Sequence, residues 1–278
     1  MTAPTTRPDV VEEARRLGRG LGAFNVVLLE HAEGIVTGAD RAGLPVVLQV
    51  SQNTARYHGA FEPVAAASLA LARAATVPVV VHLDHAEDVD LVHRAVALGV
   101  DSVMYDGSAL PYAENVATTR AVVEHCHAAG VRVEAELGEV GGKDGVHAPG
   151  VRTDPDEAAA FVASTGVDSL AVAVGTSHAM TTRTAAVDHD LIARLATAVP
   201  VPLVLHGSSG LDDDGLAGAV AAGMTKVNIS THLNALFTAA VRDVLAADDA
   251  VVDPRRYVGP GREALAAEVE RLLRILAG

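Results

Sequence analysis

The sequence is short of several residue types, and each shortage excludes a class of protein. Aromatic residues make up 3% of the chain and tryptophan is absent, so the core must be built from small aliphatic side chains. Cys126 is the only cysteine, which excludes an intrachain disulfide and favours a reducing, cytoplasmic setting. No apolar run is long enough to cross a bilayer, and the opening residues, MTAPTTRPDV, lack the apolar segment of a secretion signal. We therefore expect a cytoplasmic protein with no membrane partner.

Basic residues are also in the minority. There are 21 Lys and Arg against 35 Asp and Glu, which gives a formal net charge of −14 at pH 7. Nucleic acids and anionic membrane surfaces bind to positively charged surfaces, so neither is expected as a partner. An anionic ligand would need a locally positive site, which backbone amides, helix amino termini or a bound cation can supply.

The chain does contain a regular alternation of apolar strands and helices. Half of its 278 residues are apolar, which is enough for a full core. Eight strands, each followed by a helix at spacings of roughly 25 to 40 residues, predict an α/β fold: a single (β/α)₈ TIM barrel with an additional C-terminal helix. No linker divides the sequence, so residues 1–278 are expected to form one domain. The expected strands are 22–27, 45–51, 78–84, 101–106, 131–137, 168–174, 201–206 and 225–230, and the expected helices are 30–42, 61–75, 88–98, 112–129, 154–164, 188–197, 212–222, 232–247 and 262–276.

Polar residues collect at the carboxyl ends of the predicted strands. In this fold those ends form one rim, where the catalytic groups of barrel enzymes lie. Val79–Ala86, VVVHLDHA, is the clearest case, because an apolar strand ends in the ionisable pair Asp84 and His85. An aspartate beside a histidine suits a proton donor next to a metal ligand. The polar strand-end residues are Asn25, Ser51, Asp84, His85, Asp106, Glu136, Thr176 to His178, His206, Asn228 and Ser230.

Three rim residues are histidines from different strands. His85, His178 and His206 follow the third, sixth and seventh strands. Three neutral imidazoles that leave a fourth position open are typical of a catalytic zinc site, so we predict a bound Zn²⁺. Asp106 and Glu136 end the fourth and fifth strands on the same side of the barrel. They either orient a histidine ligand or bind a second metal position, and the sequence leaves both roles open.

Other ionisable residues are assigned to structure rather than to chemistry. Three consecutive helix residues, His125, Cys126 and His127, cannot converge on one ion and are expected on the helix surface. Glu134 is expected to pair inside the barrel with Lys226 or Arg132, because a buried charge needs a partner. The residues whose strand parity points them into the barrel below the rim are His82, Arg132, Glu134 and Lys226.

The segments after the seventh and eighth strands are rich in small residues. HGSSG, residues 206–210, and NIST, residues 228–231, both lead toward helices. Small residues let backbone N–H groups approach an anion, and barrels usually bind phosphate at this position. The two segments therefore predict a phosphate site, which meets the need for local positive charge.

With these features together, the sequence resembles the class II, metal-dependent ketose-bisphosphate aldolases, which comprise fructose-1,6-bisphosphate and tagatose-1,6-bisphosphate aldolases. The resemblance runs from the first strand to the final helix. Its segments are AFNV at 23, HLDHA at 82, SVMYDGS at 102, ENV at 114, VEAELGEVGG at 133, TGVDSLAVAVGTSH at 165, VPLVLHGSSG at 201, TKVNIST at 225 and DPRRYVGPGREA at 253.

The resemblance implies a role for individual residues. Asp84 would be the general acid, and Asp144 is the local candidate for the base that abstracts the carbon-bound proton. The implied zinc ligands are His85, His178 and His206, and the implied second metal position is formed by Asp106 and Glu136. The residues implied to contact substrate are Asn25, Ser51, Ala179, Gly207, Ser208, Ser209, Asn228, Ile229, Ser230 and Thr231.

Two positions depart from the family pattern. Ala179 takes the place of a usual glycine and bears on the phosphate loop or on a monovalent-cation site. Lys143 and Asp144 stand where an acidic pair is common. The tail is closer to the fructose-bisphosphate branch, and an arginine among Arg255, Arg256 and Arg262 is expected to reach a second phosphate. The resemblance further implies phosphorylated ketoses and triose phosphates as ligands and a homodimer or homotetramer.

The expected reaction is reversible cleavage of fructose 1,6-bisphosphate to dihydroxyacetone phosphate and glyceraldehyde 3-phosphate. Zinc would polarise the ketose carbonyl and stabilise the enediolate formed when the C3–C4 bond breaks. Tagatose 1,6-bisphosphate or another ketose phosphate is the nearest alternative substrate. More distant alternatives are a Schiff-base aldolase that uses Lys226, a metal hydrolase, and an inactive sugar-phosphate-binding barrel.

Overall fold

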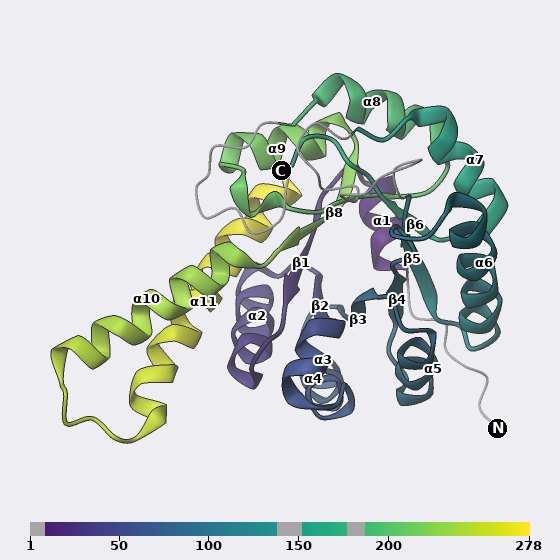
Figure 1. Ribbon diagram of the computed structural model, residues 1–278. Coiled ribbons are helices and arrows are strands. Elements are labelled where there is room, and N and C mark those ends of the chain that lie inside the picture. Colours follow the sequence, from purple (N-terminus) through teal and green to yellow (C-terminus); the bar gives the residue numbers. More distant parts are fainter. Residues whose placement is uncertain (1–8, 138–151, 177–186) are drawn as a thin grey trace.

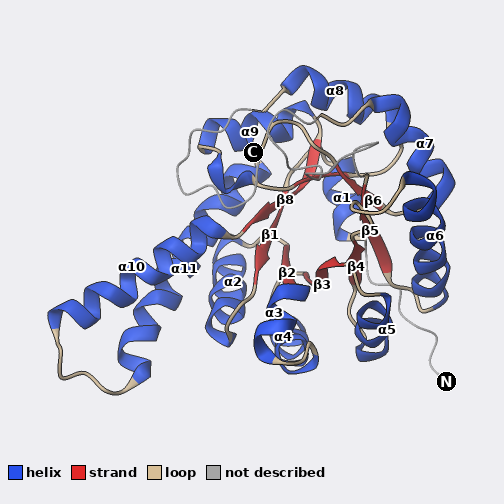
Figure 2. Cartoon of the chain, viewed as in Figure 1, coloured by secondary structure: helices blue, strands red, loops and turns tan. Residues whose placement is uncertain are grey.

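The strands close into the predicted barrel. In the computed structural model, which describes residues 9–137, 152–176 and 187–278, the strands follow one another in chain order around a closed, parallel barrel. Figure 2 shows the strands at the centre and helices around them. The strands are β1 (Leu21–Asn25), β2 (Val46–Ser51), β3 (Val79–Ala86), β4 (Ser102–Tyr105), β5 (Arg132–Glu136), β6 (Ser169–Ala171), β7 (Leu203–Leu205) and β8 (Met224–Ile229). The predicted (β/α)₈ fold is confirmed.

The helices between strands begin and end where capping residues stand. Asp88, Asp154 and Asp188 each accept a hydrogen bond from a backbone N–H of the first turn that follows. Gly43 and Gly99 end their helices in the left-handed conformation, which glycine adopts without strain. The helices are α2 (Leu29–Ala42), α4 (Glu62–Ala74), α5 (Val89–Leu98), α6 (Tyr112–Ala128), α7 (Pro155–Thr165), α8 (His189–Ala198) and α9 (Asp213–Ala222).

Three helices differ from the prediction. The sequence pattern does not predict α1 (Val10–Arg16) or α3 (Gln52–His58), because seven residues are too few to show a helical period. The last helix, α11, begins at Pro254 rather than at residue 262. Pro254 occupies the first turn, where a missing N–H is harmless, and the helix continues through Pro260.

Parallel pairing brings the carboxyl ends of the strands to one rim. Asn25 of β1 lies beside Gln49 of β2, and Ser51 of β2 lies beside Asp84 of β3. The strands below this rim are buried, so their apolar residues form the core, and the polar groups stand at or near their carboxyl ends. The predicted gathering of polar strand ends follows directly from this register.

Arg132 does not point into the barrel, so that prediction is wrong. It is the first residue of β5, and its guanidinium lies 3.0 Å from a carboxylate oxygen of Asp168 and 3.2 Å from one of Asp9. Its side chain is 54% exposed. Strand parity directs this side chain toward the inside of the barrel. Because Arg132 stands at the amino end of the strand, its long side chain extends beyond the core and reaches solvent.

Cys126 is buried rather than on the helix surface, which corrects a second prediction. It shares the inner face of α6 with Val122, one turn earlier, and both are covered by the barrel. Burial raises the pKa of the Cys126 thiol to about 11. Its neighbours His125 and His127 are exposed, as predicted.

Two long helices follow the barrel. Figure 1 shows α10 (Thr231–Ala247) and α11 (Pro254–Ala277) running antiparallel and projecting away from the strands. The later part of α11 returns to pack against α2. Across residues 9–137, 152–176 and 187–278, no helix has both the length and the apolar character needed to cross a membrane.

Gly38 sets how closely α2 and α11 approach. A Cβ atom at position 38 would lie 2.5 Å from the backbone oxygen of Ala266 and 2.8 Å from Cβ of Val269. We expect Gly38→Ala to push the helices apart and lower the free energy of unfolding by about 1–3 kcal/mol, as overpacking does. Gly259→Ala in α11, where no atom lies within 4 Å of the new Cβ, is the control and should not destabilise. Urea unfolding measures both variants, and equal stabilities would show that this contact does not limit the packing.

Candidate active site at the carboxyl rim

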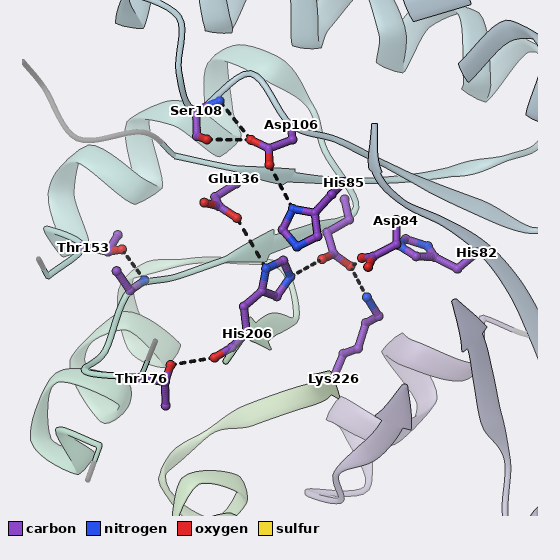
Figure 3. A network of polar contacts seen from close by, with 12 residues as sticks. His82, Asp84, His85, Asp106, Ser108, Glu136, Thr153, Thr176, His206 and Lys226 are labelled. Atoms are coloured by element: carbon purple, nitrogen blue, oxygen red, sulfur yellow. Dashed lines mark hydrogen bonds and ion pairs between the residues drawn. The ribbon is translucent and has the colours of Figure 1, made fainter. Parts of the chain in front are cut away.

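The end of β3 is irregular, and this irregularity brings two consecutive side chains to the site. The pairing of β3 with β4 shifts between Leu83 and Ala86, as at a β-bulge. His85 has a φ of +47°, the only positive value among the described non-glycine residues. Adjacent side chains of a regular strand point to opposite faces, whereas here Asp84 and His85 belong to one polar network (Figure 3). Such a backbone conformation costs of order 1–3 kcal/mol and is found mainly at functional sites.

His85, Glu136 and His206 converge at the rim. Their possible ligand atoms lie within 4.8 Å of one another, and the two imidazole rings have centroids 4.7 Å apart. Glu136 and His206 are buried, while His85 is half-buried. Two imidazoles and a carboxylate form a nitrogen and oxygen donor set that suits zinc or a similar divalent metal. The residues present therefore fit a metal ion, and the third predicted histidine, His178, lies outside the described residues.

Asp106 contacts His85 rather than joining this cluster. Its Oδ2 lies 2.9 Å from Nδ1 of His85, and its Oδ1 accepts hydrogen bonds from the backbone N and the hydroxyl of Ser108. With Nδ1 engaged in this way, a metal would be bound through Nε2 of His85. Of the two roles that the sequence leaves open, the geometry favours the orienting role for Asp106 and the metal-binding role for Glu136.

His206 is the most deeply buried member of the cluster. Its Nε2 lies 3.1 Å from Oε1 of Glu134, and its Nδ1 lies 3.4 Å from Oε2 of Glu136. Burial lowers the pKa of His206, but its contacts with the carboxylates of Glu134 and Glu136 outweigh burial and raise this pKa to about 10. The hydroxyl of Thr176 donates to the backbone oxygen of His206 at 2.6 Å and holds the main chain. The two carboxylates create a negative field that attracts a cation.

Asp84 lies beside the cluster and is also buried. Its Oδ2 accepts a hydrogen bond from Nδ2 of Asn25 at 3.2 Å, and Oδ1 of Asn25 accepts one from Nε2 of Gln49 at 3.2 Å. Burial raises the pKa of Asp84, but the charges of His85 and Lys226 outweigh burial, and the net pKa is lower than usual. The result is an ionised carboxylate with one oxygen fixed by Asn25, an arrangement that suits proton transfer.

The predicted phosphate segments lie side by side. Gly207, with φ of +66°, turns the chain after β7 into the short 3₁₀ helix η1 (Ser208–Gly210). The hydroxyl of Ser208 donates to the backbone oxygen of Asn228 at 2.5 Å, and the backbone N of Ser230 donates to the hydroxyl of Ser209 at 3.3 Å. These bonds tie the segment after β7 to the end of β8, where α10 begins at Thr231.

Other predicted substrate contacts have structural roles or are not described. The hydroxyl of Ser51 accepts a hydrogen bond from the backbone N of Thr54 and so caps α3. Ser208 and Ile229 are each 1% exposed, so neither side chain is accessible to a ligand. Two further predicted site residues, Ala179 and Asp144, lie outside the described residues.

Sequence reasoning missed Gln49 and Ser108, which support the site, and it named Thr176 as a strand-end residue without giving it a role. Gln49 orients Asn25, Ser108 holds Asp106, and Thr176 fixes the backbone of His206. Gln49 has a detectable signal, because it is a polar residue within the apolar strand VVLQVS and shares the inward parity of Ser51. Ser108 lies in a loop, where polar residues are common and carry little information.

Lys226 pairs with Glu134, which confirms one of the two predicted partnerships. The Nζ atom lies 2.8 Å from Oε2 of Glu134, and both side chains are buried. A Schiff-base mechanism needs this amine to attack the substrate carbonyl, and here Glu134 holds the amine inside the barrel. The geometry therefore favours metal-assisted chemistry over the Schiff-base alternative.

Comparison with known proteins places the chain in a family. The sequence profile described as Fructose-bisphosphate aldolase class-II matches residues 5–278. The chain belongs to the class-II fructose-bisphosphate aldolase family. Two relatives named fructose-bisphosphate aldolase are 40% identical over 265 residues (Geobacillus stearothermophilus; 94% of this chain, 92% of the relative) and 38% identical over 284 residues (Thermus caldophilus; 92% of each). As a class-II aldolase, the protein is a lyase.

Solved structures of aldolases have the same fold. The YdjI aldolase from Escherichia coli K12 superposes with a TM-score of 0.83 and 31% identity, covering 96% of this chain and 94% of that one. A putative fructose-1,6-bisphosphate aldolase from Coccidioides immitis gives a TM-score of 0.85 and 29% identity, covering 99% and 97%. The resemblance noted in the sequence is thus confirmed for both family and fold.

Proposed function

We propose that this class-II aldolase reversibly cleaves fructose 1,6-bisphosphate to dihydroxyacetone phosphate and glyceraldehyde 3-phosphate, with zinc as its cofactor. Relatives of this name at 38–40% identity support the choice of substrate. The observation that carries the proposal is the convergence of His85, Glu136 and His206 beside the buried carboxylate of Asp84.

We assign the metal to the rim cluster. His85 and His206 are the described ligands, His178 is the third ligand expected from the sequence, and Glu136 is the residue for a second cation position. Zinc held there supplies a Lewis acid for the substrate carbonyl. Asp106 orients His85 for this task through its contact with Nδ1.

We assign to Asp84 the transfer of the proton on the C4 oxygen of the substrate. In cleavage its carboxylate accepts the proton of the C4 hydroxyl, and in condensation it returns that proton to the aldehyde oxygen. Its lowered pKa keeps the accepting form populated at neutral pH. Asn25 occupies Oδ2, while Oδ1 makes no hydrogen bond within the described residues and is the oxygen assigned to the substrate. We assign to Asp144 the transfer of the proton on the C3 carbon.

The phosphate of the dihydroxyacetone half is assigned to the joined segments after β7 and β8. Gly207 and Thr231 offer backbone N–H groups, and Ser209, Ser230 and Thr231 offer hydroxyls, around the amino terminus of α10. This arrangement supplies local positive potential in a chain whose net charge is −14.

A substrate panel tests the proposed reaction. Zinc-loaded protein is assayed for triose phosphate release from fructose 1,6-bisphosphate, tagatose 1,6-bisphosphate and fructose 1-phosphate. We expect the highest kcat/KM for fructose 1,6-bisphosphate. Faster cleavage of the tagatose epimer would assign a different substrate to an active aldolase, and no cleavage of any compound would identify an inactive sugar-phosphate-binding barrel.

We further propose that residues 1–278 form one domain, that the protein acts in the cytoplasm, and that it assembles as a homodimer or homotetramer. The projecting pair α10 and α11, with Val252 88% exposed between them, supports an assembly contact outside the barrel. Light scattering coupled to gel filtration measures the assembly, and a mass of one chain at working concentration would refute it.

A further inference from the structure

Lys226 lies close to His206 inside the barrel (Figure 3), and Glu134 contacts both of these residues. Glu134 and Lys226 are each about 2% exposed. The two oxygens of Glu134 have different partners: Oε1 lies 3.1 Å from Nε2 of His206, and Oε2 lies 2.8 Å from Nζ of Lys226. His82 is also near, but its Nε2 is 4.0 Å from Oε2 of Glu134, too far to compete for the same oxygen. Lys226 is therefore connected to a proposed metal ligand through a single carboxylate.

The chemistry of these groups fixes the direction of each hydrogen bond. An ammonium only donates, and an ionised carboxylate only accepts. Glu134 therefore accepts from Lys226 on one oxygen and from His206 on the other. Nε2 of His206 must carry a proton to donate, which leaves Nδ1 as the nitrogen on the side of Glu136, 3.4 Å away.

We propose that Glu134 and Lys226 are positioning residues for metal binding, because together they fix His206 in the orientation and tautomer in which Nδ1 faces the cation. This inference rests on the proposed metal site. The sequence predicts only a structural ion pair. The inference adds that the atom of residue 134 that faces Nε2 of His206 must be a hydrogen-bond acceptor. Changing a purely structural pair lowers stability but leaves the metal affinity of the folded protein unchanged, whereas changing a positioning pair lowers that affinity as well.

Glu134→Gln separates these two roles. Lys226 can only donate, so it holds the amide oxygen of the new side chain and turns the amide NH₂ toward Nε2 of His206. Nε2 then has to accept, and the imidazole proton moves to Nδ1, where it opposes a cation. We expect the variant to bind Co²⁺ about 10- to 100-fold more weakly than the wild type, the usual loss when a partner of a metal ligand is changed.

A second change should reverse this effect. In Glu134→Gln/Lys226→Met the competing donor is gone, so the amide can turn and present its oxygen to Nε2 of His206. We expect Co²⁺ affinity to return to within about tenfold of the wild type. Arg132→Gln is the matched control, because Arg132 lies on the same strand two residues away and pairs with Asp168 at the opposite end. It should leave Co²⁺ affinity unchanged.

Titration of the chelator-stripped proteins with Co²⁺, followed by visible absorption, measures these affinities without any enzyme assay. Thermal unfolding in chelator shows that each protein is folded before titration. Equal affinities of wild type and Glu134→Gln, or no recovery in the double variant, would overturn the inference. If Glu134→Gln does not fold, the double variant alone tests the inference. A Co²⁺ affinity of the double variant more than a hundredfold below that of Arg132→Gln would then overturn the inference. Failure of the wild type to bind Co²⁺ would instead refute the proposed metal site.

Discussion

His206→Ala should lose the bound metal and the aldolase activity together. The variant removes the most buried member of the cluster and leaves Glu134 and Glu136 without the imidazole between them. We expect zinc affinity to fall at least about 100-fold and kcat/KM for fructose 1,6-bisphosphate to fall at least about 1,000-fold, because the Lewis acid is lost with its ligand. Metal analysis after dialysis and a coupled cleavage assay measure the two losses.

His125→Ala is the control for the histidine experiment. His125 is exposed on α6, away from the rim, and its removal should change neither zinc content nor turnover. A His206→Ala protein that retains stoichiometric zinc would exclude His206 as a ligand.

Asp84→Asn should lose turnover while keeping the metal. The amide has nearly the same shape and its oxygen can still accept the hydrogen bond from Asn25, but it cannot take the proton of the C4 hydroxyl. General acid–base groups contribute about 10²- to 10⁴-fold, so kcat should fall by that factor with little change in zinc affinity. Steady-state kinetics and metal titration of the same preparation give both values.

Asp88→Asn is the matched control, because Asp88 follows the same strand and caps α5. Asparagine caps helices as well as aspartate does, so activity and stability should be unchanged. If Asp84→Asn retained wild-type kcat, the proton on the C4 oxygen would have to be handled by another group.

The barrel could be predicted because its signals are repetitive. Apolar strands with polar residues at or near their carboxyl ends alternate with helices, and eight such repeats are typical of one closed barrel. The short helices α1 and α3 show no helical periodicity in the sequence. Pro260 indicates the end of a helix, although α11 continues through it. Arg132 was placed inside because strand parity gives the direction of a side chain but not its depth along the barrel.

The candidate site could be predicted as a set of residues but not as a geometry. Strand ends gave His85, His206 and Glu136, because parallel register brings them to one rim. The bulge that turns Asp84 and His85 into the same network depends on a single positive φ, which no residue in VVVHLDHA signals. The separate roles of Asp106 and Glu136 likewise depend on which atoms come within hydrogen-bond distance, and spacing alone does not determine that.

Metal removal tests the central claim most directly. The protein is stripped with a chelator, and cleavage of fructose 1,6-bisphosphate is measured before and after one equivalent of zinc per chain is returned. We predict that stripping lowers kcat at least about 100-fold and that zinc restores it. A fully stripped protein that cleaves the substrate at its original rate would contradict the account.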